Sequence, residues 1–197
     1  MFLGIPAVAG HDTIYRVTRN GRDIGGYKFS IEDRAGRREV AVKMAIKVKL
    51  LFVTVYSASH DRREVWENGR LEYCAGESTY NGNNYVLSLN REGGRCLWRV
   101  NGTEQELTDP VISFVPWRPA VTGKVTLLSE KGRADGVTVA FVGRETIQAG
   151  DHAIEMDKYQ MTGRRNEELW YDQQGVLQRV RYERQGAIIE IRLAPAA

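Results

Sequence analysis

The sequence has few of the residues that build metal centres, and it lacks long hydrophobic runs. Its 3 histidines, His11, His60 and His152, are scattered, and no CxxC or HxxxH spacing occurs. No apolar stretch approaches the ~18 residues that a membrane-spanning helix needs. A phosphate-binding loop and a GxSxG nucleophile motif are also absent. These absences predict a protein with no metal, no cofactor and no transmembrane span.

Blocks of one charge are missing too. The 28 basic residues are interleaved with 25 acidic ones, which gives a net charge of +3. Basic residues gather only in short pieces, such as Arg34, Arg37 and Arg38, whereas a nucleic-acid-binding surface needs a basic patch or stripe. We therefore expect no nucleic-acid partner. The 42% of hydrophobic and 27% of charged residues are typical of a globular domain.

Cysteine is scarce, with Cys74 and Cys96 alone. If the glycine-containing segments between them close two successive hairpins, Cys74 lies opposite Asn90 and Cys96 lies opposite Arg91. The two thiols then sit on strands separated by a third. Two strand spacings of ~4.8 Å exceed the ~7 Å limit between the Cα atoms of a disulfide. The sequence predicts two free thiols.

The N-terminus has the character of a secretory signal. Residues 2–8 are short and apolar, and Ala7-Val8-Ala9 has the small-x-small form of a signal-peptidase site. On this interpretation residues 1–10 are the remnant of a signal peptide, residues 11–197 form a single β domain, and the protein is periplasmic or secreted. The alternative is an apolar N-terminal strand.

What the sequence has in abundance is alternation of apolar and polar residues, the pattern of strands with one buried face. Asn-Gly and Gly-Gly pairs suited to hairpin turns separate the alternating segments. Because helical segments to cover the apolar face are missing, we predict an all-β fold, an antiparallel meander curled into a barrel or half-barrel. The expected strands are residues 12–19, 25–33, 38–49, 52–67, 71–80, 84–92, 95–101, 137–148, 152–162, 166–173, 177–185 and 187–193.

Residues 108–131 interrupt this pattern. Pro110, Pro116 and Pro119 surround Trp117 there, and proline is excluded from central strands. We expect a crossover or lid with room for one helical turn.

Several longer segments, taken in order, resemble a known family. They read YRVTRNGRDIGGYKFSI, KVKLLFVTVYSASHDRREVWENGRL, FVPWRPAV, GRETIQAGDHAIEMDKYQMTG and ELWYDQQGVLQRVRYERQGAIIEIRL. From about Thr13 to Leu193 the chain resembles a bacterial family of secreted proteins of unknown function. More distantly it is similar to the lipoprotein-localisation carriers. This resemblance implies an incomplete antiparallel barrel, and in the distant relatives the concave apolar face holds acyl chains beneath a lid.

The interior of such a barrel is the candidate ligand site. Met44, Ile46 and Val48 mark the inner face of one strand, and the run from Leu50 to Val53 is interpreted as a bend with both faces covered. The tryptophans either line a cavity or plug the barrel. A cavity of ~300 Å³ or more near Trp117 would favour a ligand. The residues predicted to line it are Met44, Ile46, Val48, Phe52, Trp66, Trp117 and Trp170.

The candidates for catalysis are His60, Glu64 and Glu145. His60, Arg62 and Glu64 alternate along one strand and so share one face, where the histidine could act as a general base. The simpler interpretation is a solvated strand end with cross-strand ion pairs. Glu145 lies beside Gly143 and Ile147, and a buried carboxyl group there would have a raised pKa. Pairing with an arginine on a neighbouring strand is the alternative.

Three functions follow from these patterns. The first is an envelope protein that binds an apolar, lipid-like small molecule in the concave face. The second is a structural or assembly factor with a filled barrel. The third, an enzyme, would be a lyase or isomerase that uses His60 or Glu145.

Overall fold

The computed structural model describes residues 9–50, 52–117, 122–149, 152–163 and 166–195. Most of the predicted signal remnant, residues 1–8, lies outside the described residues. Fifteen strands are present: β1 (Ala9–Arg19), β2 (Arg22–Arg34), β3 (Arg37–Leu50), β4 (Val53–Glu67), β5 (Arg70–Tyr80), β6 (Asn83–Glu92), β7 (Arg95–Val100), β8 (Thr103–Leu107), β9 (Val111–Ile112), β10 (Gly123–Leu128), β11 (Ala134–Ala149), β12 (His152–Thr162), β13 (Glu167–Tyr171), β14 (Leu177–Arg184) and β15 (Ala187–Leu193).

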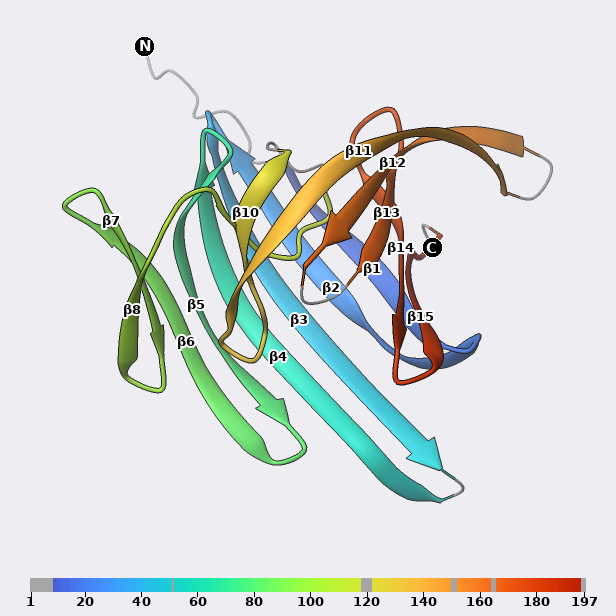
Figure 1. The fold of residues 1–197 in the computed structure, drawn as a ribbon, viewed down its shortest axis with the longest axis horizontal. Helices are drawn as coiled ribbons and strands as arrows, with labels where there is room; N and C mark the ends of the chain where they lie inside the picture. Colours follow the sequence, from blue (N-terminus) through green and yellow to red (C-terminus); the bar gives the residue numbers. More distant parts are fainter. Residues whose placement is uncertain (1–8, 51, 118–121, 150–151, 164–165, 196–197) are drawn as a thin grey trace, which may run out of the picture.

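All of these strands belong to one sheet, and its order follows the chain. The order runs from β8 back to β1, continues with β15, and runs back again to β9. The pairing of β1 with β15 joins the two halves, and the β9–β10 pair is the one parallel pair among the described strands. The sheet curls until β9 touches β5, which nearly closes a barrel (Figure 1). The predicted all-β meander is confirmed.

Asparagine-glycine turns fix the hairpins, as the sequence predicts. Asn81 and Gly82 both have positive φ, 48° and 84°, as a two-residue type I′ turn requires. The Asn81 side chain also accepts a hydrogen bond from the backbone N–H of Ser57 at 2.8 Å, and the Asn81 N–H donates to the Ser57 carbonyl at 3.0 Å. Asn101 bonds Val86 in the same way. Each asparagine therefore links its own hairpin turn to the strand that precedes that hairpin in the chain.

The strands β8, β9 and β10 were not predicted. The segment 108–131, expected as a crossover or lid, contains β9 and β10, and none of its described residues is helical. β10 pairs with β11 in regular antiparallel register from Gly123 to Leu128. β9 has only two residues, so alternation along the chain could not reveal it. Pro110 and Pro116 lie outside these strands and do not interrupt them.

Candidate functional site

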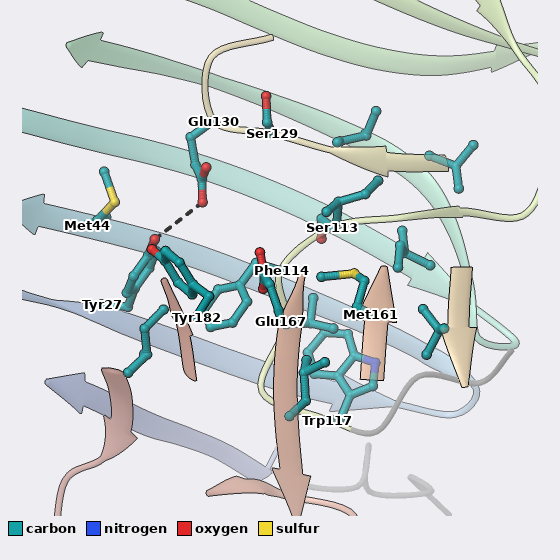
Figure 2. A pocket seen from close by; sticks show the side chains of 18 of the residues that line it. Tyr27, Met44, Ser113, Phe114, Trp117, Ser129, Glu130, Met161, Glu167 and Tyr182 are labelled. Carbon is teal, nitrogen blue, oxygen red and sulfur yellow. Dashed lines mark hydrogen bonds between the residues drawn. The ribbon is translucent and has the colours of Figure 1, made fainter. Parts of the chain in front are cut away.

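A cavity of about 480 Å³ lies inside the curled sheet (Figure 2). One wall comes from β2 to β5, and the opposite wall from β10 to β15. Its lining is mostly apolar or aromatic, and the side chains that face one another across it include Met44, Ile46 and Trp66 on one wall and Leu127, Val139, Met161, Leu169 and Ile191 on the other. Alternation along each strand brings these residues to the same face.

Residues 109–117, here named the strap, run through the interior from one side of the barrel to the other. At its start, Arg91 donates two hydrogen bonds to the carboxylate of Asp109, at 2.8 and 2.7 Å. At its end, the N–H of Leu177 donates to the carbonyl of Pro116 at 2.9 Å, and Trp117 forms a β-bridge with Val176. Both ends are thus anchored to the barrel, and the segment that the sequence suggested as a lid is an internal strap.

Aromatic rings fill the spaces beside the strap. Phe114 packs on Tyr27 and Phe29, with ring centroids 5.0 and 5.8 Å apart. Trp117 meets Trp66 edge to face at 5.4 Å. These contacts pack the strap against β2 and β4. The aromatic residues therefore do both things that the sequence left open, because some fill the barrel and some line its cavity.

The inward side chains of β4 are polar between two apolar ends. Ala58 and Trp66 flank His60, Arg62 and Glu64, and all three ionisable side chains are buried. The expectation of a solvated strand end is therefore wrong, although the shared face was inferred correctly. The side chains of Arg62 and Glu64 are 2% and 0% exposed, and Nε of Arg62 lies 2.7 Å from Oε1 of Glu64. The other carboxylate oxygen of Glu64 accepts a hydrogen bond from Nε1 of Trp66 at 2.7 Å.

His60 has a hydrogen-bond partner that the sequence did not reveal. Its Nδ1 lies 2.7 Å from the hydroxyl of Ser78, which stands opposite it on β5. Burial, and then the charge of Arg62, lower the pKa of His60 to about 4. Neither His60 nor Ser78 lines the internal cavity. A substrate in the cavity would not reach this pair, so the geometry does not favour general-base catalysis there.

Glu145 is not a buried acid. Its side chain is 45% exposed, and it accepts hydrogen bonds from Trp170 at 2.8 Å and Lys158 at 2.9 Å. These two bonds lower the pKa of Glu145. The alternative of a buried carboxyl group with a raised pKa is therefore wrong, and the alternative of pairing with a neighbouring strand holds with Lys158 in place of an arginine. Trp170, which was predicted to line the ligand site, lies on the other face of β13 from the cavity residue Leu169. Lys158 and Arg179 sit over its ring.

The other predicted lining residues divide into two groups. Met44, Ile46, Trp66 and Trp117 line the cavity, whereas Val48 and Phe52 do not. Phe52, between β3 and β4, is 100% exposed. The prediction that residues 50–53 form a bend with both faces covered is therefore wrong. Leu50 pairs directly with Val53 across this turn, and the hairpin extends beyond the barrel wall (Figure 1).

Carboxylates and hydroxyls that the sequence did not single out also line the cavity. Glu130 follows β10 and accepts a hydrogen bond from the hydroxyl of Tyr27 at 3.4 Å. Glu167 begins β13 and is 4% exposed. Ser113 lies on the strap, is 4% exposed, and its hydroxyl has no hydrogen-bond partner. Ser113 and Glu130 lie in the segment 108–131, which alternation did not describe, whereas Glu167 lies in the predicted strand 166–173 but was not marked as an inward residue.

The two cysteines are free, as predicted, and both are buried. Cys96 pairs with Arg91 as expected, whereas Cys74 faces Leu89, one residue from the expected Asn90. Burial raises the pKa of Cys74 to about 12, so its thiol stays protonated. Across the described ranges, no group of three or more His, Cys, Asp or Glu side chains is placed to hold a metal. Nor does that part of the chain contain a helix long and apolar enough to cross a membrane.

Comparison with known proteins places the fold but not the activity. No curated protein matches the chain. A solved structure, a beta-barrel-like protein of the domain of unknown function DUF1849 from Brucella abortus, is similar with a TM-score of 0.63 and 8% sequence identity, over 94% of this chain and 95% of that one. The model of a second family, described as a domain of unknown function (DUF6134), matches residues 15–194. The chain belongs to this DUF6134 family.

Proposed function

We propose that this protein binds an apolar, lipid-like small molecule inside its barrel. The observation that carries the proposal is the cavity of about 480 Å³ inside the barrel. This volume falls in the range of ~300–1,000 Å³ that is usual for small-molecule sites. A lining of mostly apolar and aromatic side chains supports an apolar ligand, because burying such a surface against the ligand is the main favourable term.

The two ends of the cavity differ from its middle. Arg70 lines one end at the turn between β4 and β5, and Arg184 lines the other end, 5.9 Å from the ring of Tyr56. Arginines at the two ends with mostly apolar walls between them suit an elongated molecule. This arrangement supports a binding protein more than a filled structural barrel.

Displacement of a neutral dye tests the proposal. N-phenyl-naphthylamine, which fluoresces in apolar surroundings, is titrated into the wild type and into Ala58→Phe. Ala58 lines the cavity and is buried, so the added ring occupies ligand space, and we expect dye affinity to fall by about tenfold or more. Ser59→Phe is the matched control, because Ser59 is the next residue on β4 and is exposed on the opposite face.

A second cavity-filling variant guards against misfolding. Val139→Phe enters from β11 on the opposite wall, and circular dichroism checks that both variants keep the β fold. Dye binding that both cavity variants and the control retain equally would contradict the proposal.

We also propose that the protein is exported to the periplasm or beyond. The apolar residues 2–8 and the Ala7-Val8-Ala9 sequence support this location, and fractionation of the native cells would test it.

A further inference from the structure

We propose that Ser113 holds an uncharged hydrogen-bonding group of the ligand, such as a hydroxyl or a carbonyl, in the middle of the cavity. This inference rests on the proposed function and names the class of ligand. The occupant would be an apolar molecule with a neutral polar group, and not a plain hydrocarbon or a fatty-acid anion.

The first step is the state of the Ser113 hydroxyl. Ser113 is 4% exposed and lines the cavity, yet its hydroxyl forms no hydrogen bond with the protein. Buried polar groups are nearly always paired, because an unpaired one loses its hydration without compensation. The other cavity serine, Ser129, differs, since its oxygen accepts a hydrogen bond from the N–H of Arg133 at 3.0 Å. A ligand group is the partner that Ser113 lacks.

The second step is position. Ser113 lies between Val111 and Phe114 on the strap, which is anchored at both ends. Figure 2 shows Ser113 near the centre of the view, between the Tyr27–Glu130 pair and Trp117. A molecule that fills the cavity would therefore contact the strap beside Ser113. A polar group at that point can be recognised without an exposed headgroup.

The charged residues that line the cavity favour a neutral ligand group beside Ser113. Glu130 and Glu167 line the cavity, and both have contacts of their own within the protein. An anionic group beside them would be repelled strongly in a low-dielectric interior. A cationic ligand group would have no unpaired carboxylate to bind, because Glu130 and Glu167 already interact with other residues. The lining cations, Arg70 and Arg184, lie at the ends. The unpaired group in the middle is a neutral hydroxyl, which suits a neutral partner.

A competition experiment tests this assignment. Decane, decanol, a methyl ketone of the same length and decanoate displace the neutral dye from the wild type and from Ser113→Ala at neutral pH. A single neutral hydrogen bond is worth ~2- to 12-fold in affinity. We expect Ser113→Ala to weaken decanol and the ketone by about fivefold and to leave decane unchanged. In the wild type, decanoate should bind more weakly than decanol.

Two further variants separate recognition from damage to the fold. Ser113→Thr keeps the hydroxyl and should restore selectivity for the polar compounds. Ser129→Ala removes a cavity hydroxyl that is already paired and should leave the ratio between decanol and decane unchanged. Because Ser113→Ala removes an unpaired buried group, its melting temperature should not fall.

The outcomes distinguish the two proposals. If the dye and decane bind but Ser113→Ala weakens no polar compound, or weakens decane equally, the role of Ser113 is overturned while the binding cavity stands. Tighter binding of decanoate than of decanol also overturns it. If neither the dye nor any of the compounds binds to the folded protein, the proposed function fails, and this inference fails with it.

Discussion

Three successive inward side chains of β4 form a row of ionisable groups, namely His60, Arg62 and Glu64. The residues opposite them on β3 are apolar. His60 faces Met44, and Arg62 faces Val42. Arg62 and Glu64 form a buried ion pair, and Glu64 also accepts a hydrogen bond from Trp66. Removing one partner of such a pair would leave an uncompensated buried charge. The Nε2 atom of His60 is buried without a hydrogen-bond partner.

We predict that His60 makes stability depend on pH. Burial lowers the pKa of His60 from its ordinary 6.5 to about 4, so between these values the unfolded chain binds more protons than the folded one. The free energy of unfolding is therefore highest above about pH 6.5 and falls as the pH drops toward 4, by at most ~3 kcal/mol. His60→Gln should flatten this slope in urea unfolding measured across that range.

His11→Gln is the control for this experiment, since His11 is exposed on β1. Its stability should follow the wild-type slope. An unchanged slope in His60→Gln would show that the buried histidine does not control the pH response.

The sequence predicted that His60, Arg62 and Glu64 share a face, but not that this face is buried. Ionisable side chains are mostly exposed, which favoured a solvated strand end. Apart from Trp66 on the same strand, the groups around this row come from distant segments, namely Ser78 on β5 and Glu130 after β10. No pattern along β4 reports these partners. The place of Ser113 in the cavity could not be predicted for the same reason, because the strap and both walls together form its surroundings.

At the scale of elements, the close approach of β4 and β5 depends on one glycine. Gly76 lies opposite Arg62, and a Cβ atom there would lie 2.4 Å from the carbonyl oxygen of Asp61 and 2.8 Å from Cα of Arg62. Both neighbours are backbone atoms that cannot move without disturbing the ladder. The missing side chain therefore makes room for the buried arginine.

We expect Gly76→Ala to destabilise the protein by ~1–3 kcal/mol, because the methyl group must push the strands apart. Gly136→Ala is matched to it, since Gly136 also lies in a strand but a Cβ atom there would meet nothing within 4 Å. Its effect should stay within ~1 kcal/mol. Equal stability of the two variants in urea unfolding would refute the packing argument.

The elements themselves were largely predictable. Two-residue turns such as Asn81-Gly82 and Gly93-Gly94 have positive φ at both positions, and this requirement is visible in the residue types. The strap was not predictable in the same way. Its Val111 pairs in parallel with Thr126, a contact set by the barrel around it and not by a local turn or an alternating pattern.

At the scale of the whole molecule, the curled sheet explains how a protein without helices in its described residues buries an apolar face. Alternation shows which side chains point inward, but not whether they meet in the middle. That depends on the curvature of fifteen strands and on the path of the strap, both of which are global properties. The DUF1849 protein has a similar fold at 8% identity, so the architecture tolerates very different sequences, and function must be argued from the cavity.

Native mass spectrometry with decanol would show whether a ligand binds inside the barrel. We expect one bound decanol for each wild-type chain, loss of this adduct in Ala58→Phe, and its retention in Ser59→Phe. A wild-type mass that stays unchanged at saturating decanol, or equal binding to Ala58→Phe, would contradict a ligand site inside the barrel.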